Sequence, residues 1–278
     1  MKKLLFIPLV AFVVFLSSCS EDGETSTDLV ETFDLETEET AEANFEDVDD
    51  IVDSTVETQI SGARVDESEV LDGAVITHDT ENNTITIDYG DGVEGPGGRL
   101  RSGMIIITYS ELRWLPGAFR EVTFQDFYVD SVQVEGVRRL ENTSASTDEA
   151  PQFTVSLTGG RLTFADGTTI TREVNKVRTW NRANNPVNDT VIVTGTATGS
   201  RRDGRTYTVE ILEEIMYKRG CRVGRVFIPV SGTKLITAGD NTALVDYGDG
   251  DCDNIATISV NDGEAEEFNI VLRSGRRL

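Results

Sequence analysis

The chain has 278 residues, and its formal net charge of −24 is unevenly distributed. Residues 20–72 contain 20 acidic residues and one basic residue, Arg64, so the remaining body, residues 73–278, carries only −7. Because nucleic acid is bound through basic surface that faces the phosphates, this balance argues against a nucleic-acid partner.

The first 18 residues have the features of a secretory signal peptide. Lys2 and Lys3 precede an apolar run from Leu4 to Leu16 that is too short to cross a bilayer as a helix. The next residues, Leu-Ser-Ser-Cys at 16–19, resemble the lipobox of bacterial lipoproteins, in which the cysteine becomes the lipidated first residue of the mature chain. The resemblance implies that residues 1–18 are removed and that acyl chains on Cys19 hold the protein on a membrane. An uncleaved N-terminal anchor is the alternative.

Residues 19–43 are dominated by Glu, Asp and Thr. This segment has too few large apolar residues to offset the entropy cost of ordering, so we predict a disordered acidic tether. Glu21-Asp22 resembles the acidic signals that export some Bacteroidetes lipoproteins to the cell surface. We therefore expect an outer-membrane location, with exposure at the surface favoured over the periplasm.

The pattern changes at residues 44–60, where apolar residues recur at helical spacing. One face of the predicted helix carries Phe45, Val48, Ile51, Val52, Val56 and Ile60. Asn44 can serve as the N-cap, so we predict one short amphipathic helix over 44–60 whose apolar face packs on the body. Acidic residues lie off this face, and those late in the helix oppose its macrodipole, so partial formation is the alternative.

From residue 74 to residue 273 the hydrophobic period becomes two. Ile85, Ile87 and Tyr89 alternate with polar residues, and Asn-Asn, Asp-Gly and Gly-Asp turn signals separate many such segments. Parallel strands would need long crossover connections, which these short loops do not provide. We predict a single, mainly β domain in which about a dozen antiparallel strands form a meander, either a sandwich or an extended curved sheet.

The alternation slips between Val122 and Gly136. Val122 and Phe124 share one phase, whereas Phe127 and Val129 share the other. A β-bulge near Gln125-Asp126 and a kink near Asp130-Ser131 would restore the register.

The motif Asp-Tyr-Gly-Asp-Gly occurs twice, at 88–92 and 246–250. It predicts two related hairpins that open and close the body, because glycine supplies positive φ and aspartate caps a turn through its side chain. Alternatively, Asp249, Asp251 and Asp253 could direct three carboxylates toward one Ca²⁺. Complete calcium loops also use a later acid, and Val260 stands at that position.

Two cysteines remain if Cys19 carries lipid. Cys221 and Cys252 form an even pair in an exported, oxidising setting, and neither belongs to a Cys-x-x-Cys metal pair. We predict a disulfide between them, which would stabilise the fold by roughly 3–4 kcal/mol in the loop-entropy model. Two buried free thiols are the alternative.

Several of these features together resemble a group of uncharacterised Bacteroidetes outer-membrane lipoproteins. The likeness rests on the lipobox, the acidic tether, the repeated turns at 87–92 and 247–253, and the strand that begins at Arg101-Ser102-Gly103. It implies a location and a fold, and no activity.

Catalytic constellations are poor in this sequence. His78 is the single histidine, and Glu213-Glu214 are adjacent, which sends their side chains to opposite faces of a strand. General acid–base catalysis needs convergent groups with shifted pKa values. We therefore predict that the protein is not an enzyme.

Two sets of residues remain as candidates for binding. The basic residues gather in loops: Arg201, Arg202, Arg205, Lys218, Arg219, Arg222 and Arg225. They are expected to be solvated turns and guards of edge strands, or a dock for the acidic tether or for anionic envelope glycans. The aromatic candidates for stacking on sugars are Trp114, Trp180, Tyr109 and Tyr128, although such residues in a β domain belong more often to the core.

The expected function is a non-catalytic binding or structural module of the cell envelope. Its expected partners are the membrane, through the lipid anchor, and envelope or host glycans or proteins. The alternative is a surface adhesion module that binds glycan or Ca²⁺.

Overall fold

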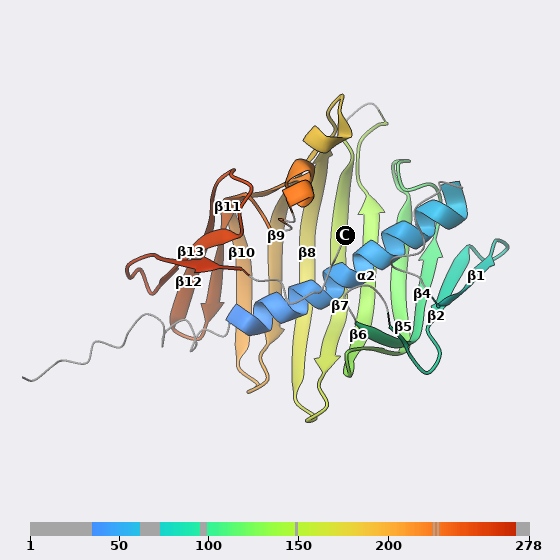
Figure 1. The fold of residues 1–278 in the computed structure, drawn as a ribbon, viewed down its shortest axis with the longest axis horizontal. Coiled ribbons are helices and arrows are strands. Elements are labelled where there is room, and N and C mark those ends of the chain that lie inside the picture. The colour runs from blue at the N-terminus through green and yellow to red at the C-terminus, as the bar shows by residue number, and fades with distance from the viewer. Residues whose placement is uncertain are drawn as a thin grey trace, which may run out of the picture.

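The described residues form one open antiparallel sheet with a helix across one face of it (Figure 1). The computed structural model describes residues 35–61, 73–94, 99–147, 150–224, 226 and 228–270. The helix, α2, comprises Leu35–Ser61 and runs diagonally over the sheet from the side of β10 toward the side of β4 (Figure 1). The signal peptide, Cys19 and most of the predicted tether lie outside the described residues.

The sheet contains 14 strands in sequence order. The strands are β1 Val75–Asp79, β2 Thr84–Asp88, β3 Val93–Glu94, β4 Leu100–Tyr109, β5 Phe119–Val129, β6 Val132–Asn142, β7 Gln152–Thr163, β8 Thr169–Asn181, β9 Thr190–Ser200, β10 Thr206–Lys218, β11 Ser231–Ala238, β12 Asn241–Asp249, β13 Ile255–Val260 and β14 Glu266–Asn269. Each strand pairs antiparallel with its neighbours along the chain, and the short β3 pairs with β4 beside this path. The predicted antiparallel meander is confirmed, in the form of a single extended sheet.

Alternation along the strands divides the sheet into two faces. Ile85 and Ile87 of β2, and Ile105 and Ile107 of β4, are completely buried on the face that carries the helix. Thr84 and Thr86 alternate with the isoleucines of β2, on the other face, and stay partly exposed. Burial of an isoleucine side chain contributes about 1.5–3 kcal/mol, so this face and the helix together form the core.

The slip in alternation has two separate causes. The register between β4 and β5 shifts between Ser102 and Met104, opposite Asp126, whose φ is 46°. The predicted bulge near Gln125-Asp126 is therefore confirmed.

The predicted kink at Asp130-Ser131 is wrong, because these two residues form the turn between β5 and β6. Val129 pairs with Val132, and the two residues between them have φ values of 50° and 69°. Positive φ at both central residues is typical of the type I′ turns that close two-residue hairpins.

Helix α2 begins at Leu35 instead of at the predicted Asn44. Asn44 is not an N-cap: its side-chain amide donates to the Thr40 carbonyl at 2.8 Å, inside the helix. The last nine residues of the predicted disordered segment, 35–43, are thus helical. The predicted apolar face is buried from Phe45 to Val56, Ile60 at its end is partly buried, and Ala41 extends the face by a further turn.

The bulge opposite Asp126 should require glycine at position 103. A Cβ at Gly103 would lie 1.9 Å from the Asp126 carbonyl oxygen, and the φ of Gly103 is +79°. We expect Gly103→Ala to lower the free energy of unfolding by about 3 kcal/mol or more.

Gly159→Ala is the matched control, because Gly159 has a φ of +64° but no atom near the position of a Cβ. The left-handed backbone conformation alone should lower the free energy of unfolding of this variant by about 1–2 kcal/mol. Equal losses in urea denaturation for the two variants would contradict the steric argument.

Candidate functional site

Basic side chains occupy inward positions on the helix-facing side of the sheet. The buried ones, with their exposed fractions, are Arg101 (3%), Arg120 (7%), Arg138 (5%), Arg172 (1%) and Lys234 (7%). They follow the same alternation as the aliphatic residues around them, so the strands place them in the core. Such buried charges require partners.

Helix α2 supplies those partners from its acidic residues. Near the start of the helix, Glu38 and Glu42 both pair with Arg172 of β8, and Glu42 accepts a hydrogen bond from Lys176 at 2.6 Å. Asp47 lies 2.8 Å from Arg101 of β4, in a contact in which two guanidinium nitrogens donate to the carboxylate.

The second half of the helix continues the series. Asp49 accepts hydrogen bonds from two nitrogens of Arg138 on β6. Asp53 pairs with Arg120 of β5, and the Asp53 carboxylate also lies 3.4 Å from the guanidinium of Arg113. These five acidic residues and their basic partners, which we call the helix clasp, fasten the helix to four strands of the sheet: β4, β5, β6 and β8.

The helix clasp perturbs the ionisation of its carboxyl groups. Burial works to raise the pKa of Glu42, but Lys176 and Arg172 outweigh it and hold that pKa well below its usual range. Burial also works to raise the pKa of Asp49, but the charge and hydrogen bonds of Arg138 outweigh it and lower that pKa. The carboxyl groups of Glu42 and Asp49 are therefore charged at neutral pH.

Desolvation offsets most of the Coulomb attraction in buried ion pairs of this kind. The burial of Phe45, Val48 and Ile51 supplies the larger share of the docking free energy. The ion pairs determine where along the sheet the helix rests, because any shift would leave several buried charges unpaired.

A second cluster lies at one end of the sheet. The loops after β4, β6, β8 and β10 share that end, because successive strands are antiparallel. Trp114, from the loop after β4, contacts Trp180, from the end of β8, with ring centroids 5.3 Å apart. Phe153 of β7 completes the cluster, 6.0 Å from Trp114.

Buried polar residues hold both tryptophans in place. Asn142 donates from its side chain to the Arg113 carbonyl at 2.9 Å and thereby fixes the loop of Trp114. Asp189 accepts a hydrogen bond from the Trp180 indole at 3.1 Å and another from the Ala183 amide at 2.9 Å. The Ala183 amide, with a smaller contribution from Trp180, lowers the pKa of Asp189.

The cluster carries apolar and cationic groups that reach solvent. Trp114 and Trp180 are half-buried, and exposed apolar residues stand in the same two loops: Leu112 (49%), Leu115 (39%) and Val187 (49%). The guanidinium carbons of Arg113 and Arg182 lie 4.1 and 4.2 Å from the centre of the Trp114 ring. We call this group of residues, Leu112–Leu115, Trp180, Arg182 and Val187, the loop-end surface.

Of the aromatic candidates, only the two tryptophans belong to this surface. Tyr109 is buried, and its hydroxyl lies 2.7 Å from His78 Nε2. Tyr128 of β5 pairs across the sheet with Ser102 and Gln133, away from the loops after β4 and β8. Tyr109 is thus a core residue, as aromatic residues of β domains most often are.

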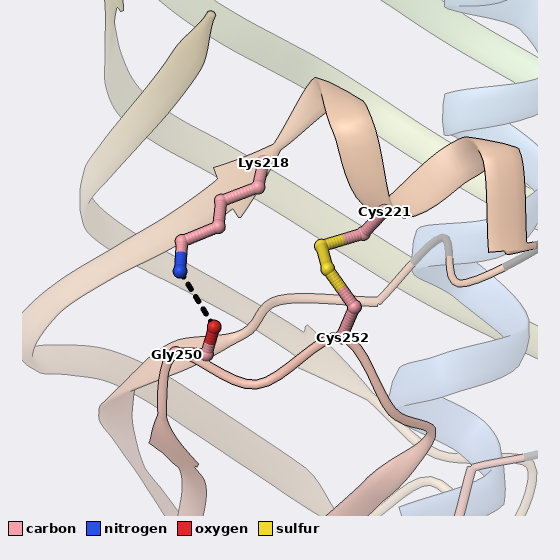
Figure 2. Close-up of a disulfide and its surroundings, with 4 residues drawn as sticks. All are labelled: Lys218, Cys221, Gly250 and Cys252. Atoms are coloured by element: carbon pink, nitrogen blue, oxygen red, sulfur yellow. Dashed lines mark hydrogen bonds between the residues drawn. A yellow bond between two sulfur atoms is a disulfide. The ribbon is translucent and has the colours of Figure 1, made fainter. Parts of the chain in front are cut away.

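The basic loop residues do not form one patch. Arg202 stacks on Phe164, Arg205 pairs with Asp203, and Arg219 lies 3.6 Å from Asp189. Arg201 is buried. Lys218 donates to the Gly250 carbonyl at 2.6 Å (Figure 2).

The side chains of Arg222 and Arg225 lie outside the described part of the chain. The described part of the acidic segment, from Leu35 onward, docks on basic residues of the strands.

The predicted disulfide is confirmed. Cys221, in the 3₁₀ helix η4 (Arg219–Gly224), is bonded to Cys252 in the loop between β12 and β13, with a Cα–Cα distance of 5.2 Å (Figure 2). The bond joins η4 to a distant hairpin, and the Lys218 contact with Gly250 lies beside it. The loop after β10 is therefore fixed at two points.

The repeated motif makes the same local hydrogen bond twice, in a turn after β2 and at the end of β12. Asp88 accepts a hydrogen bond from the Gly90 amide, and Asp246 accepts one from the Gly248 amide, both at 2.8 Å. Asp253 caps a further turn by accepting from the Ile255 amide at 3.1 Å.

Within the described residues, no three His, Cys, Asp or Glu side chains gather closely enough to hold a metal ion. Asp249, Asp251 and Asp253 therefore do not converge into the calcium site considered for them.

Comparison with known proteins gives no relative: neither family models, nor curated proteins, nor solved structures match this chain. Among the described helices, none is long and apolar enough to cross a membrane.

The helix clasp should behave as a set of buried ion pairs in mutational analysis. We expect Arg138→Met to lower the free energy of unfolding by about 3 kcal/mol, because it leaves the Asp49 carboxylate poorly compensated in the core. The double variant Arg138→Met with Asp49→Asn should recover part of that loss, as measured by denaturant unfolding. Single losses below about 1 kcal/mol, with no coupling, would indicate an exposed pair and contradict the assignment.

Acid should weaken the clasp. Carboxyl groups whose pKa is lowered by folding stabilise the protein above their unfolded pKa and lose that contribution as the pH falls through the folded value. Because the pKa of Glu42 lies well below the ordinary value of 4.5, we expect the melting temperature to fall steadily below about pH 4.5.

Glu42→Gln should reduce this dependence on pH, whereas Glu210→Gln, at an exposed position of β10, should leave it unchanged. Identical acid profiles for the two variants and the parent would contradict the role of Glu42.

Proposed function

We propose that this protein is a lipid-anchored, non-catalytic binding module of the bacterial outer membrane, exposed at the cell surface. The lipobox that ends at Cys19 and the acidic signal at Glu21-Asp22 support the anchor and the location. The sheet acts as a rigid support, and the loop-end surface is the part that meets a ligand.

The half-exposed pair Trp114 and Trp180 carries this proposal. Partly exposed tryptophan beside exposed leucine and valine offers apolar area to a partner, and tryptophan is enriched at binding surfaces for that reason. Asn142 and Asp189 hold the loops from below, so little ordering entropy is lost on binding.

The helix clasp supports the same proposal because it joins the proposed membrane anchor to the sheet. Residues 19–34 connect the proposed anchor at Cys19 to the start of helix α2. Because the helix contacts strands from β4 to β8, the anchor is joined to the middle of the sheet. Arg113 extends the connection, since it pairs with Asp53 of the helix and also stacks on Trp114.

Location is tested by protease accessibility on intact cells, followed with an antibody to the β body. We expect digestion from outside in cells that express the parent chain. We expect release of the protein from the membrane fraction for Cys19→Ser. Protection until the outer membrane is opened would contradict surface exposure, and membrane retention of Cys19→Ser would contradict the lipid anchor.

Binding is tested with the purified protein, residues 20–278, which retains helix α2 and the sheet, on an array of bacterial and host polysaccharides. Trp180→Ala should weaken any specific binding about tenfold or more, as expected when a central aromatic contact is truncated. Leu212→Ala is the control, because Leu212 is an exposed apolar residue (52%) on β10, outside the loop-end surface. Binding that is lost equally in both variants would place the ligand elsewhere.

A further inference from the structure

We propose that the loop-end surface binds acidic polysaccharide, with the guanidinium of Arg182 as the group that receives the anion. This inference rests on the proposed binding function and adds the chemical class of the ligand. Three observations carry it: the surroundings of Arg182, the partners of the neighbouring arginines, and the way in which the loop is fixed.

Arg182 is exposed, and its guanidinium carbon lies 4.2 Å from the centre of the Trp114 ring and 5.9 Å from that of Trp180. Stacking on an indole covers one face of the guanidinium and restricts the side chain, while the N–H groups in its plane stay free to donate. A guanidinium held in this way can bind a carboxylate, sulfate or phosphate through two parallel hydrogen bonds.

Its neighbours at this end of the sheet already face carboxylates. Arg113 lies 3.4 Å from Asp53, and Arg219 lies 3.6 Å from Asp189. No carboxylate of the described residues forms an ion pair with Arg182. The net charge of the body is negative, so a positive group kept without an acidic partner is the feature here that favours an anionic ligand.

The loop that carries Arg182 is held at several points. Asp189 binds the Trp180 indole and the Ala183 amide, and its carbonyl accepts from the Arg219 amide at 3.0 Å. Arg219 begins η4, which the disulfide of Cys221 fixes to the β12–β13 loop. Figure 1 shows η4 close to η3 (Pro186–Asn188) at this end of the strands.

The apolar part of the surface fits the carbohydrate portion of such a ligand. Sugar rings present C–H faces as well as hydroxyl groups, and aromatic and aliphatic side chains pack against those faces. Leu112, Leu115 and Val187 are exposed in the two loops that hold Trp114 and Arg182. The surface therefore combines an apolar platform with one cationic group, as a chain of acidic sugars requires.

The test uses pairs of polymers that share a backbone and differ in charge. Polygalacturonate and its methyl ester provide the carboxylate pair, and dextran sulfate and dextran provide the sulfate pair. Binding of the purified protein, residues 20–278 with helix α2 included, to each polymer is measured by biolayer interferometry at two salt concentrations. We expect binding to at least one charged polymer, binding to its neutral partner that is weaker by about tenfold or more, and a loss of affinity as the salt rises.

Arg182→Gln should remove the difference between the charged and neutral polymers, and Arg182→Lys should restore it only in part, because an ammonium group lacks the planar pair of donors. The matched control is Arg202→Gln. Arg202 also stacks on an aromatic ring, at 3.4 Å from the centre of Phe164, but it belongs to the loops at the opposite end of the sheet. Both glutamine variants change the net charge equally, so an effect confined to Arg182→Gln excludes a general electrostatic cause.

The other outcomes separate this inference from the proposed function. Equal binding to a charged polymer and its neutral partner, weakened by Trp180→Ala, would overturn the anionic ligand and leave the binding function intact. Binding to neither pair would overturn the acidic-polysaccharide ligand. Charge-dependent binding that Arg182→Gln leaves unchanged would overturn the role of Arg182.

Discussion

The buried ion pairs between helix α2 and the sheet are the interactions on which the arrangement of this molecule depends. A single sheet has two faces, and the aliphatic face of this one needs a cover if the fold is to be stable in water. One helix supplies that cover, and its own sequence is strongly acidic. The fold is possible because Arg101, Arg120, Arg138 and Arg172 point inward at the positions where the helix presents its carboxylates.

Helix α2 is both acidic and part of the core, and its two kinds of residue have different effects. Apolar burial of Phe45, Ile51 and their neighbours holds the helix on the sheet, and the ion pairs specify its position and direction. Arg113 joins this arrangement to the loop-end surface, because it contacts both Asp53 and the Trp114 ring. Under the proposed function, the anchor side and the ligand side of the protein are thus connected through one row of charged contacts.

Much of the fold could be predicted from the sequence because its rules are local. Alternation with short turns indicates an antiparallel meander, paired cysteines in an exported chain indicate a disulfide, and Asp-Tyr-Gly indicates a turn closed by its aspartate. The start of the helix could not be predicted in this way. Glu38 and Glu42 are stabilised by Arg172 and Lys176, which lie more than a hundred residues further along the chain. The alternation of β8 places Arg172 on the buried face, between Ile170 and Val174. Alternation by itself does not predict which residues lie opposite it.

The candidate site shows the same limit. Trp114 and Trp180 were recognised as candidates for sugar binding, yet their contact depends on two loops that only the strand order brings together. The basic loop residues were weighed as a patch and are in fact spread over both ends of the sheet. Arg182 could not be predicted from the sequence, since an isolated arginine after a strand carries no local signal of its stacking on Trp114.

Amide hydrogen exchange along helix α2 tests the central claim most directly, because it reports whether the acidic helix is fastened to the sheet in solution. The account predicts that the amides from Phe45 to Val56 exchange about as slowly as those in the middle of β7 and β8, since all of them open only when the core opens. Rapid exchange throughout the helix, with the sheet still protected, would contradict the claim that the helix clasp forms part of the folded core.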